Sequence, residues 1–233
     1  MFPSVRVYYA PADYENQTAG HWRGRTVVVF DILRATSTIV TALANGYQSV
    51  RCFREVAAAQ RYAADHDRTA LAGERDGVPQ SGFRYGNSPG EFLSKPASHD
   101  HLALTTTNGT RAIESVSGAR QIIIASLLNL TAVADFLRRG PDSSLALICS
   151  GSGEDFSLED AIAAGALLVE LNVDHPLTSL YIANRDDLRR AFCVSKNGRH
   201  LLEINLAADI DWCLQRDKYV IVPRLVAGVV KNS

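Results

Sequence analysis

The sequence predicts an α/β fold, in which three α/β/α layers surround a mixed, largely parallel sheet. Short apolar runs rich in valine and isoleucine alternate with segments of helical periodicity along most of the 233-residue chain. Several of these runs end in a polar loop that leads directly into a helix, as expected for crossovers between parallel strands. Such crossovers leave a ligand site outside the carboxyl ends of the strands.

The first half of the chain repeats this strand-to-helix unit. A first strand is expected at residues 5–9, and the polar segment 12–25 is expected to be a loop. The next helix should end at Asn45-Gly46, a pattern typical of a helix C-cap. The other elements expected here are strands at 26–31, 48–53 and 69–72 and helices at 36–44 and 55–65.

The second half keeps the alternation as far as residue 172. The expected strands are 101–106, 121–125 and 145–149, and the expected helices are 110–116, 130–138 and 158–171. The portion from about residue 173 is predicted to be mostly helical, at 178–192, 198–205 and 207–216, with a final strand at 219–222. No linker rich in Pro, Gly or Ser separates it, so residues 1–233 are interpreted as a single domain. We expect this portion to pack on the same sheet or to supply a contact in a homo-oligomer.

Composition narrows the class of protein. The 24 basic and 25 acidic side chains nearly cancel, which argues against a nucleic-acid-binding or membrane-surface protein. The four cysteines are scattered without a paired spacing and are expected to be reduced thiols. The start at residues 1–6 has no basic segment followed by an apolar one, and no run is long enough to span a membrane. We therefore predict a cytoplasmic protein.

The first candidate ligand site is the junction after the strand at 26–31. Asp31 and Arg34 are followed by the hydroxyl residues Thr36 and Ser37 at the start of a helix. A helix start disfavours a cation but offers unpaired N–H donors, so an arginine there makes sense if a phosphate or carboxylate is bound. The alternative is a simple hydroxyl N-cap with a surface arginine.

A second junction has the same pattern. Thr107, Asn108, Gly109, Thr110 and Arg111 lead from the strand at 101–106 into a short helix, again with hydroxyls and an arginine. In a largely parallel sheet both junctions are expected at the same edge, where one anion could contact both.

Residues 76–89 form a glycine-rich segment between the strand at 69–72 and the strand at 101–106. Segments of that length without secondary structure are usually functional, and the aromatic residues Phe83 and Tyr85 argue for order. We predict an ordered loop that closes over the bound anion.

Three other positions, at Cys149, Asp31 and Ser157, resemble parts of known motifs. Cys149 ends a strand, but a phosphatase cysteine loop needs an arginine in the next helix turn, and Glu154 and Asp155 stand there. Asp31 as an aspartyl nucleophile needs a second acid two residues later, where Leu33 stands, so this reading stays a weak rival. Ser157 is interpreted as a helix N-cap with acids in the first turn. No dinucleotide or phosphate-loop fingerprint is present.

Four segments taken together resemble the 2-phosphosulfolactate phosphatase family. They are Asp31-Ile32-Leu33-Arg34-Ala35-Thr36-Ser37-Thr38, Gly73-Glu74-Arg75, Gly82-Phe83-Arg84-Tyr85-Gly86-Asn87-Ser88-Pro89 and Thr105-Thr106-Thr107-Asn108-Gly109-Thr110, in this order. The likeness extends to Ser126-Leu127-Leu128-Asn129 and Phe156-Ser157-Leu158-Glu159-Asp160 and covers residues 26–164. The resemblance implies a Mg²⁺-dependent phosphatase that converts 2-phosphosulfolactate to 3-sulfolactate and phosphate, a step toward coenzyme M.

The resemblance also implies roles for residues. Asp31 and Glu74, the acids nearest strand ends, are expected to be catalytic and to hold Mg²⁺. The residues expected to bind a small anionic phosphorylated substrate are Arg34, Thr36, Ser37, Arg75, Asn87, Thr107, Asn108, Gly109, Thr110 and Arg111. Two alternatives stay open: a phosphatase for another phosphorylated acid, and a non-catalytic module that binds an anionic metabolite.

Overall fold

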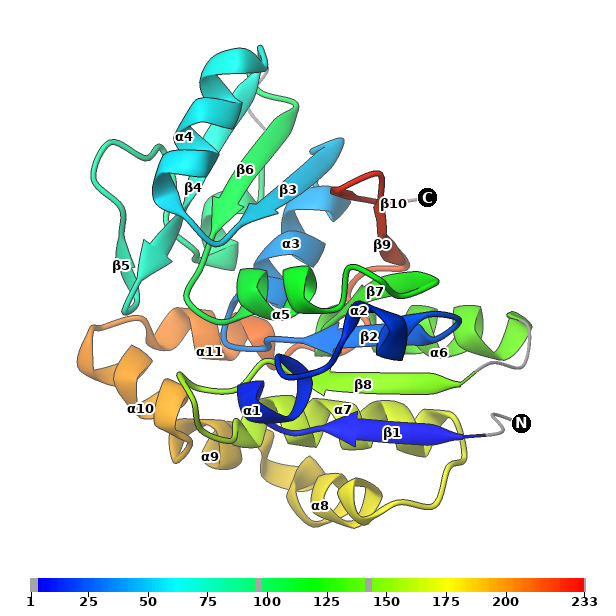
Figure 1. The fold of residues 1–233 in the computed structure, drawn as a ribbon. Coiled ribbons are helices and arrows are strands. Elements are labelled where there is room, and N and C mark those ends of the chain that lie inside the picture. The colour runs from blue at the N-terminus through cyan, green and yellow to red at the C-terminus, as the bar shows by residue number, and fades with distance from the viewer. Residues whose placement is uncertain (1–3, 95–97, 141–143, 233) are drawn as a thin grey trace.

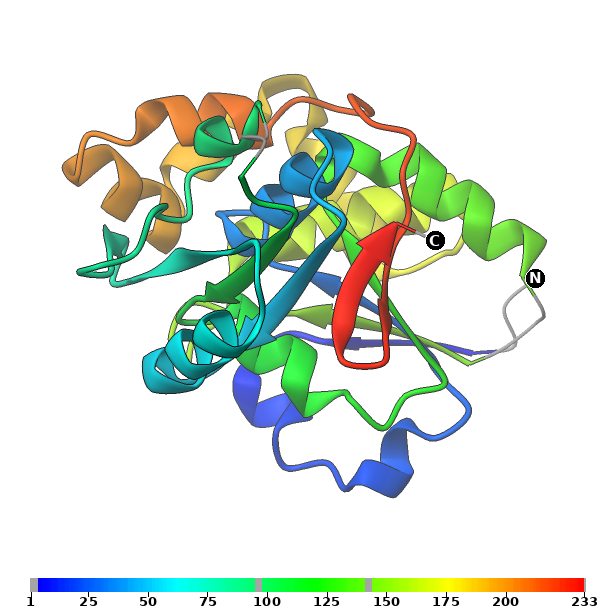
Figure 2. The same ribbon diagram turned by 90° about the horizontal axis from the view of Figure 1, so that it is seen from above.

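A computed structural model describes residues 4–94, 98–140 and 144–232 of the chain. Its centre is a ten-stranded mixed sheet with helices on both faces (Figures 1 and 2), which confirms the predicted three-layer α/β/α class. The strands are β1 Val5–Tyr8, β2 Thr26–Phe30, β3 Ser49–Phe53, β4 Thr69–Arg75, β5 Val78–Pro79, β6 His101–Thr105, β7 Gln121–Ala125, β8 Leu145–Cys149, β9 Pro223–Val226 and β10 Val229–Asn232.

The helices follow the strands in the expected alternation up to residue 170. The α-helices are α1 Pro11–Tyr14, α2 Ala19–Trp22, α3 Ala35–Ala44, α4 Val56–Asp65, α5 Gly109–Ser115, α6 Leu130–Arg139, α7 Leu158–Glu170, α8 Pro176–Asn184, α9 Leu188–Cys193, α10 Lys196–Glu203 and α11 Ala207–Cys213. Short 3₁₀ helices lie at Pro89–Phe92, Leu127–Asn129 and Arg185–Asp187. Within the described residues no helix is long and apolar enough to cross a membrane.

The sheet consists of two parallel blocks joined by an antiparallel hairpin. Strands β1, β8, β2 and β7 run parallel to one another, and β3, β6 and β4 form the second block. Between them, β9 is antiparallel to β7, and β10 is antiparallel to β9 and β3. The two blocks therefore run in opposite directions along the sheet.

Twist brings the carboxyl ends of the two blocks together. Neighbouring strands rotate by about 20–25°, so the five steps from β2 to β6 accumulate about 100–125°. Figure 1 shows β2 and β8 running from right to left and β6 running downward, toward the same region. The predicted shared edge of one parallel sheet is thus replaced by two strand ends that converge at an angle.

Alternating residues of the central strands pack into two cores. On β2, Val28 and Phe30 contact one core, and Val27 and Val29 contact the other. All five residues of β2 are buried, as expected for a parallel strand covered on both faces. Figure 2 shows α6 and α7 on one side of the sheet and α1, α2 and α5 on the other.

The helical tail packs on the first of these cores. Leu177, Phe192, Leu201 and Ile210 from α8–α11 are buried there together with residues of α7. Helix α8 lies so close to α7 that a Cβ on Gly165 would come within 2.1 Å of the Leu177 carbonyl oxygen. The expected packing of the tail on the sheet is therefore confirmed.

Several local predictions were wrong. Residues 12–25 contain α1 and α2, where Tyr14 and Trp22 are fully buried, rather than only a loop. The predicted helix at 178–192 is interrupted, and the predicted strand at 219–222 is replaced by the β9–β10 hairpin. The loop at 76–89 is ordered but contains strand β5, which pairs with β4.

Candidate active site

A cavity of about 570 Å³ lies where the ends of the two blocks converge. Five regions line it: the β2–α3 junction, the β4–β5 turn and the segment that follows, the β6–α5 junction, the β8–α7 loop, and helix α10. The lining residues are Asp31, Leu33, Arg34, Glu74, Asp76, Gly77, Asn87, Thr106, Thr107, Asn108, Ser152, Gly153, Lys196, Asn197, Arg199, His200, Leu201 and Glu203.

Asp31 follows β2 directly and lies in this cavity, 6% exposed. Its Oδ1 accepts a hydrogen bond from the Ala35 N–H at 3.1 Å. Burial raises the pKa of Asp31 to about 7, with further contributions from the charges of Glu74 and Glu159, while the Ala35 N–H and Arg34 act in the opposite direction. A carboxyl with this pKa can accept or release a proton near neutral pH.

Thr36 and Ser37 hold the junction in shape instead of lining the cavity. Both are fully buried, and their hydroxyls donate to the carbonyls of Asp31 and Ile32, each at 2.9 Å. The Asp31 N–H in turn donates to Thr36 Oγ1 at 3.1 Å. These bonds fix the backbone on both sides of the Asp31 carboxylate.

Arg34 lines the cavity but is already paired. Its Nη1 lies 2.7 Å from Asp209 Oδ2 of helix α11, and the same oxygen accepts a 2.7 Å bond from Ser88 Oγ. Arg34 Nη2 donates to the Gly77 carbonyl at 3.3 Å. With 4% of Arg34 exposed, this buried pair connects the β2–α3 junction to residues 76–89 and to the tail.

Glu74, near the end of β4, is the second carboxylate of the cavity and is 7% exposed. Its Oε2 accepts from the Gly77 N–H at 2.7 Å, and its Oε1 accepts from the Thr107 N–H at 2.9 Å. Arg75 lies outside the cavity lining, where it donates to the Arg54 and Glu74 carbonyls and to Thr105 Oγ1. Glu74 therefore joins the carboxyl ends of β4 and β6.

The second junction reaches Asp31 through Gly109. A Cβ on Gly109 would lie 2.5 Å from Ala35 Cβ and 2.8 Å from Asp31 Oδ2, so the residue has no room for a side chain. Asn108 lines the cavity, and its Oδ1 accepts from the Gly153 N–H at 3.1 Å. Thr110 is fully buried and donates to the Thr106 carbonyl at 2.8 Å. The β2–α3 and β6–α5 junctions are thus in direct contact.

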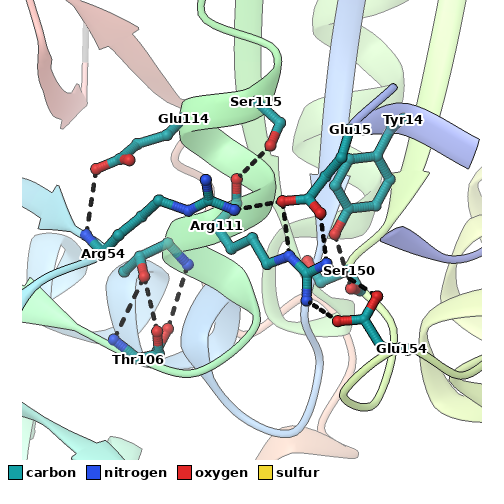
Figure 3. A network of polar contacts seen from close by, with 10 residues as sticks. Tyr14, Glu15, Arg54, Thr106, Arg111, Glu114, Ser115, Ser150 and Glu154 are labelled. Atoms are coloured by element: carbon teal, nitrogen blue, oxygen red, sulfur yellow. Dashed lines mark hydrogen bonds and ion pairs between the residues drawn. The ribbon is translucent and has the colours of Figure 1, made fainter. Parts of the chain in front are cut away.

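Arg111 is not among the residues that line the cavity, and Figure 3 shows its side chain between Glu15 and Glu154. It forms ion pairs with Glu15, from the segment after α1, and with Glu154, from the β8–α7 loop. These two carboxylates raise the pKa of the Arg111 guanidinium above its usual value. The structure therefore does not bring Arg111 together with Arg34.

Asn87 carries an unsatisfied atom. The residue lines the cavity, is 5% exposed, and holds the loop through its carbonyl, which accepts from Thr38 Oγ1 at 2.8 Å. Its side-chain Oδ1 is buried without a hydrogen-bond partner among the residues described. Such an atom costs about 1–3 kcal/mol unless a ligand or water completes it.

Asp160 belongs to the site region but was interpreted only as part of a helix cap. The cap is confirmed, because Ser157 Oγ accepts from the Asp160 N–H at 3.3 Å. The Asp160 carboxylate, however, accepts from the Ile32 N–H at 2.8 Å and the Gly151 N–H at 3.3 Å. Burial, followed by the charges of Asp31 and Glu159, raises the pKa of Asp160 well above its usual value. Asp160 lies in the first turn after the capping residue Ser157, and this position gave no sign that its carboxylate also accepts hydrogen bonds from the Ile32 and Gly151 N–H groups.

The contribution of the tail was also missed. Helix α10 lines the cavity with Lys196, Asn197, Arg199 and His200, at least 85 residues after the sequence motifs of the two junctions. Asp209 of α11 pairs with Arg34. No local pattern in residues 173–216 distinguishes these side chains from other polar helix residues.

Oxygen ligands suited to a hard cation are present. Asp31 and Glu74 are both buried in the cavity lining, and the charge of Glu74 acts on Asp31. Across 4–94, 98–140 and 144–232 there is no group of three or more His, Cys, Asp or Glu side chains arranged to hold a metal ion. A metal here would need ligands from substrate and water besides the two carboxylates.

Comparison with known proteins gives a consistent result. The family model of the 2-phosphosulpholactate phosphatases matches residues 12–228. A "Probable 2-phosphosulfolactate phosphatase" of Caldanaerobacter subterraneus subsp. tengcongensis is 36% identical, covering 90% of this chain and 91% of the relative. Proteins of the same printed name from Pseudothermotoga lettingae and Symbiobacterium thermophilum are each 39% identical, covering 85% and 89% of this chain and 88% and 94% of the relatives.

Proposed function

The chain belongs to the 2-phosphosulpholactate phosphatase family, and from this premise we propose that it is a phosphoric monoester hydrolase for 2-phosphosulfolactate or a similar small phosphorylated acid. The products are phosphate and the corresponding hydroxy acid, 3-sulfolactate for the named substrate. The observation that carries this proposal is the convergence of Asp31 and Glu74, from two opposed strand blocks, in one cavity. A module that only binds anions gains nothing from two buried carboxylates there.

The proposal includes a magnesium ion held by Asp31 and Glu74. Mg²⁺ is usually bound through one or two carboxylates together with waters and substrate phosphate oxygens, which suits this donor set. The unpartnered Asn87 Oδ1 offers a third oxygen in the same cavity. A bound divalent ion would neutralise charge on the phosphoryl oxygens during transfer.

The chain's own residues fix the two carboxylates before substrate arrives. Glu74 accepts hydrogen bonds on both oxygens, from Gly77 and Thr107, so its orientation is set. Asp31 accepts from the Ala35 N–H, and burial, by raising its pKa to about 7, keeps part of it protonated at neutral pH in the free protein. Metal binding requires the ionised form, so it should release a proton at this pH.

Phosphate release from a panel of phosphorylated acids, with Mg²⁺ and with EDTA, tests the proposal. We expect release only with the divalent ion and fastest with 2-phosphosulfolactate. Titration calorimetry of Mg²⁺ alone in two buffers of different ionisation enthalpy should detect the released proton, and Glu74→Gln should weaken Mg²⁺ binding. Absence of phosphate release from every ester would refute the proposed phosphatase activity. Unchanged release in EDTA would refute only the proposed need for Mg²⁺.

Three broader predictions accompany this proposal. The reaction would serve a route toward coenzyme M where the host makes it, and the cytoplasmic location and homo-oligomeric state stay predictions. Fractionation of cells and light scattering of the purified protein would test the last two.

A further inference from the structure

Helix α10 forms a wall of the cavity that differs from the sheet ends. The sheet ends contribute the carboxylates Asp31 and Glu74, whereas α10 contributes Lys196, Arg199 and His200. In Figure 1 the helix lies beside α11, on the side toward which β2 and β8 run. The cavity therefore combines carboxylates from the sheet with the cations Lys196 and Arg199 from the tail, where the acid Glu203 of α10 also lines it.

The helix is attached to its neighbours by polar contacts. Asn197 Nδ2 donates to Glu159 Oε1 at 2.6 Å, and Asn197 Oδ1 accepts from Ser152 Oγ at 2.7 Å. One turn further along the helix, His200 Nε2 lies 2.9 Å from the Asp76 carbonyl. These contacts fix α10 to both the β8–α7 loop and the β4–β5 turn, so its cavity face is preorganised.

The cations of the cavity are not equivalent. Arg34 is paired with Asp209, and Lys196 Nζ lies 2.7 Å from Asp155 Oδ2. Arg199 is exposed and donates from Nη1 to the Val194 carbonyl at 2.5 Å, but within the described ranges no carboxylate pairs with it. Arg199 is thus the arginine whose charge is available to an anion entering the cavity.

We propose that Arg199 binds the acid group of the substrate that does not react, a carboxylate or sulfonate, and thereby sets a preference for phosphorylated acids over simple phosphate esters. This inference rests on the proposed phosphatase function. A planar guanidinium can donate two parallel N–H bonds to an acid group, and such charge-assisted contacts are about twice as strong as neutral ones. The reacting phosphate then faces the carboxylate side of the cavity.

The test compares two substrates that are both phosphate monoesters of a secondary alcohol. 2-Phosphosulfolactate carries further acid groups besides the phosphate, and isopropyl phosphate carries none. For Arg199→Ala we expect kcat/KM to fall about 10- to 100-fold with 2-phosphosulfolactate, mainly through KM, and to stay within about twofold with isopropyl phosphate. Arg199→Lys should recover part of the loss because it restores the charge without the planar fork.

Arg185→Ala is the matched control, since it removes an exposed arginine of the same tail that does not line the cavity. This variant should leave kcat/KM unchanged for both substrates. Equal losses with both substrates for Arg199→Ala, or no loss with either, would overturn the role of Arg199 while the phosphatase proposal stands.

A binding arm separates this inference from failure of the phosphatase proposal. If the wild-type protein releases no phosphate from any ester, calorimetric titration of 3-sulfolactate decides the question. Binding that Arg199→Ala weakens at least tenfold would support the acid-binding role. Equal affinity of both proteins, or no binding to either, would overturn it.

Discussion

The two strand-to-helix junctions carry similar sequences but use their arginines differently. After β2, Arg34 lies in the cavity lining beside Asp31. After β6, Arg111 lies outside the lining and pairs with Glu15 and Glu154. The same set of residue types, hydroxyls and an arginine at a helix start, thus serves a site at one junction and a surface network at the other.

The difference follows from the position of each arginine relative to its helix. Arg34 is the N-cap of α3, so its side chain leaves the chain before the first turn, beside the strand end. Arg111 is the third residue of α5, after Gly109 and Thr110, and therefore projects from the side of the helix. The N-cap lies outside the helical turn, with φ −143° and ψ −11° at Arg34, so the two side chains leave the backbone in different directions. Position relative to the cap, rather than composition, decides which arginine can reach the site.

The largest effect expected from this comparison is on Asp31, the acid that the second junction lacks. Asp31→Asn should keep the fold and lower turnover by at least about a hundredfold, because a carboxylate proposed as metal ligand is worth several kcal/mol in the transition state. Steady-state phosphate release with saturating Mg²⁺ measures this. Asp135→Asn, at an exposed carboxylate paired with Arg138, is the control and should retain full turnover. Wild-type turnover in a folded Asp31→Asn protein would remove Asp31 from the chemistry.

The second prediction compares alanine substitutions at Arg34 and Arg111. Arg34→Ala leaves Asp209 buried without its cation, which should cost about 3–5 kcal/mol and lower the Tm by about 6–20 °C. Arg111→Ala removes two partly exposed ion pairs, each worth at most about 1 kcal/mol, and should leave kcat/KM within about twofold.

Thermal unfolding and phosphate release of both variants measure the contrast. A tenfold loss of kcat/KM in Arg111→Ala with a normal Tm would show that the second junction does bind substrate. Equal Tm values in the two variants would show that the buried pair contributes no more than the surface network.

The third prediction separates the two junctions physically. Gly109→Ala would place a methyl group against Ala35 and the Asp31 carboxylate, and overpacking of this kind costs about 1–3 kcal/mol. We expect the Tm to fall by about 2–12 °C and turnover to fall because Asp31 is displaced. Gly90→Ala is the control, since nothing lies within 4 Å of the added methyl. If both variants behave alike, the contact between the junctions is not needed.

Much of the fold could be predicted because its signals are local. The strands at 26–31 and 145–149 were identified from apolar β-branched runs, and β2 and β8 lie there with every residue buried. The β9–β10 hairpin was missed because its strands pair with β7 and β3, far away along the chain. A usable signal was the Ala227-Gly228 turn, where both residues have positive φ, between two short apolar runs.

The site could be predicted only where it depends on strand ends. Of the residues predicted to form the site, those that line the cavity each follow or flank a strand end or loop that the sequence marks; they are Asp31, Arg34, Glu74, Asn87, Thr107 and Asn108. Arg199 could not be predicted, since its place depends on contacts of α10 with segments at least 38 residues away. Long-range packing, not local pattern, decides which polar residues of the tail face the site.

The last prediction concerns the pH dependence of stability, and it again distinguishes the acidic first junction from the second. Burial raises the pKa of Asp31 from 3.8 to about 7, so between these values the folded protein binds a proton that the unfolded chain releases. Stability from this group is therefore complete below about pH 4 and is lost as the pH rises toward 7. One pKa unit corresponds to about 1.4 kcal/mol, and each kcal/mol moves the Tm of a chain of this size by about 2–4 °C.

Asp31→Asn removes this titration while keeping an oxygen that can accept from the Ala35 N–H. In EDTA we expect the variant to unfold at least about 2 °C above the wild-type protein at pH 8, with the difference closing toward pH 4. Asp31→Asn also removes one of the charges that raise the pKa of Asp160, so the measured difference reports on the two carboxyls together. Asp135→Asn should show no such trend, because its carboxylate is exposed. A constant Tm difference from pH 4 to 8 would mean that Asp31 is ionised throughout, and the buried cavity would then have to supply a cation for it in the resting protein.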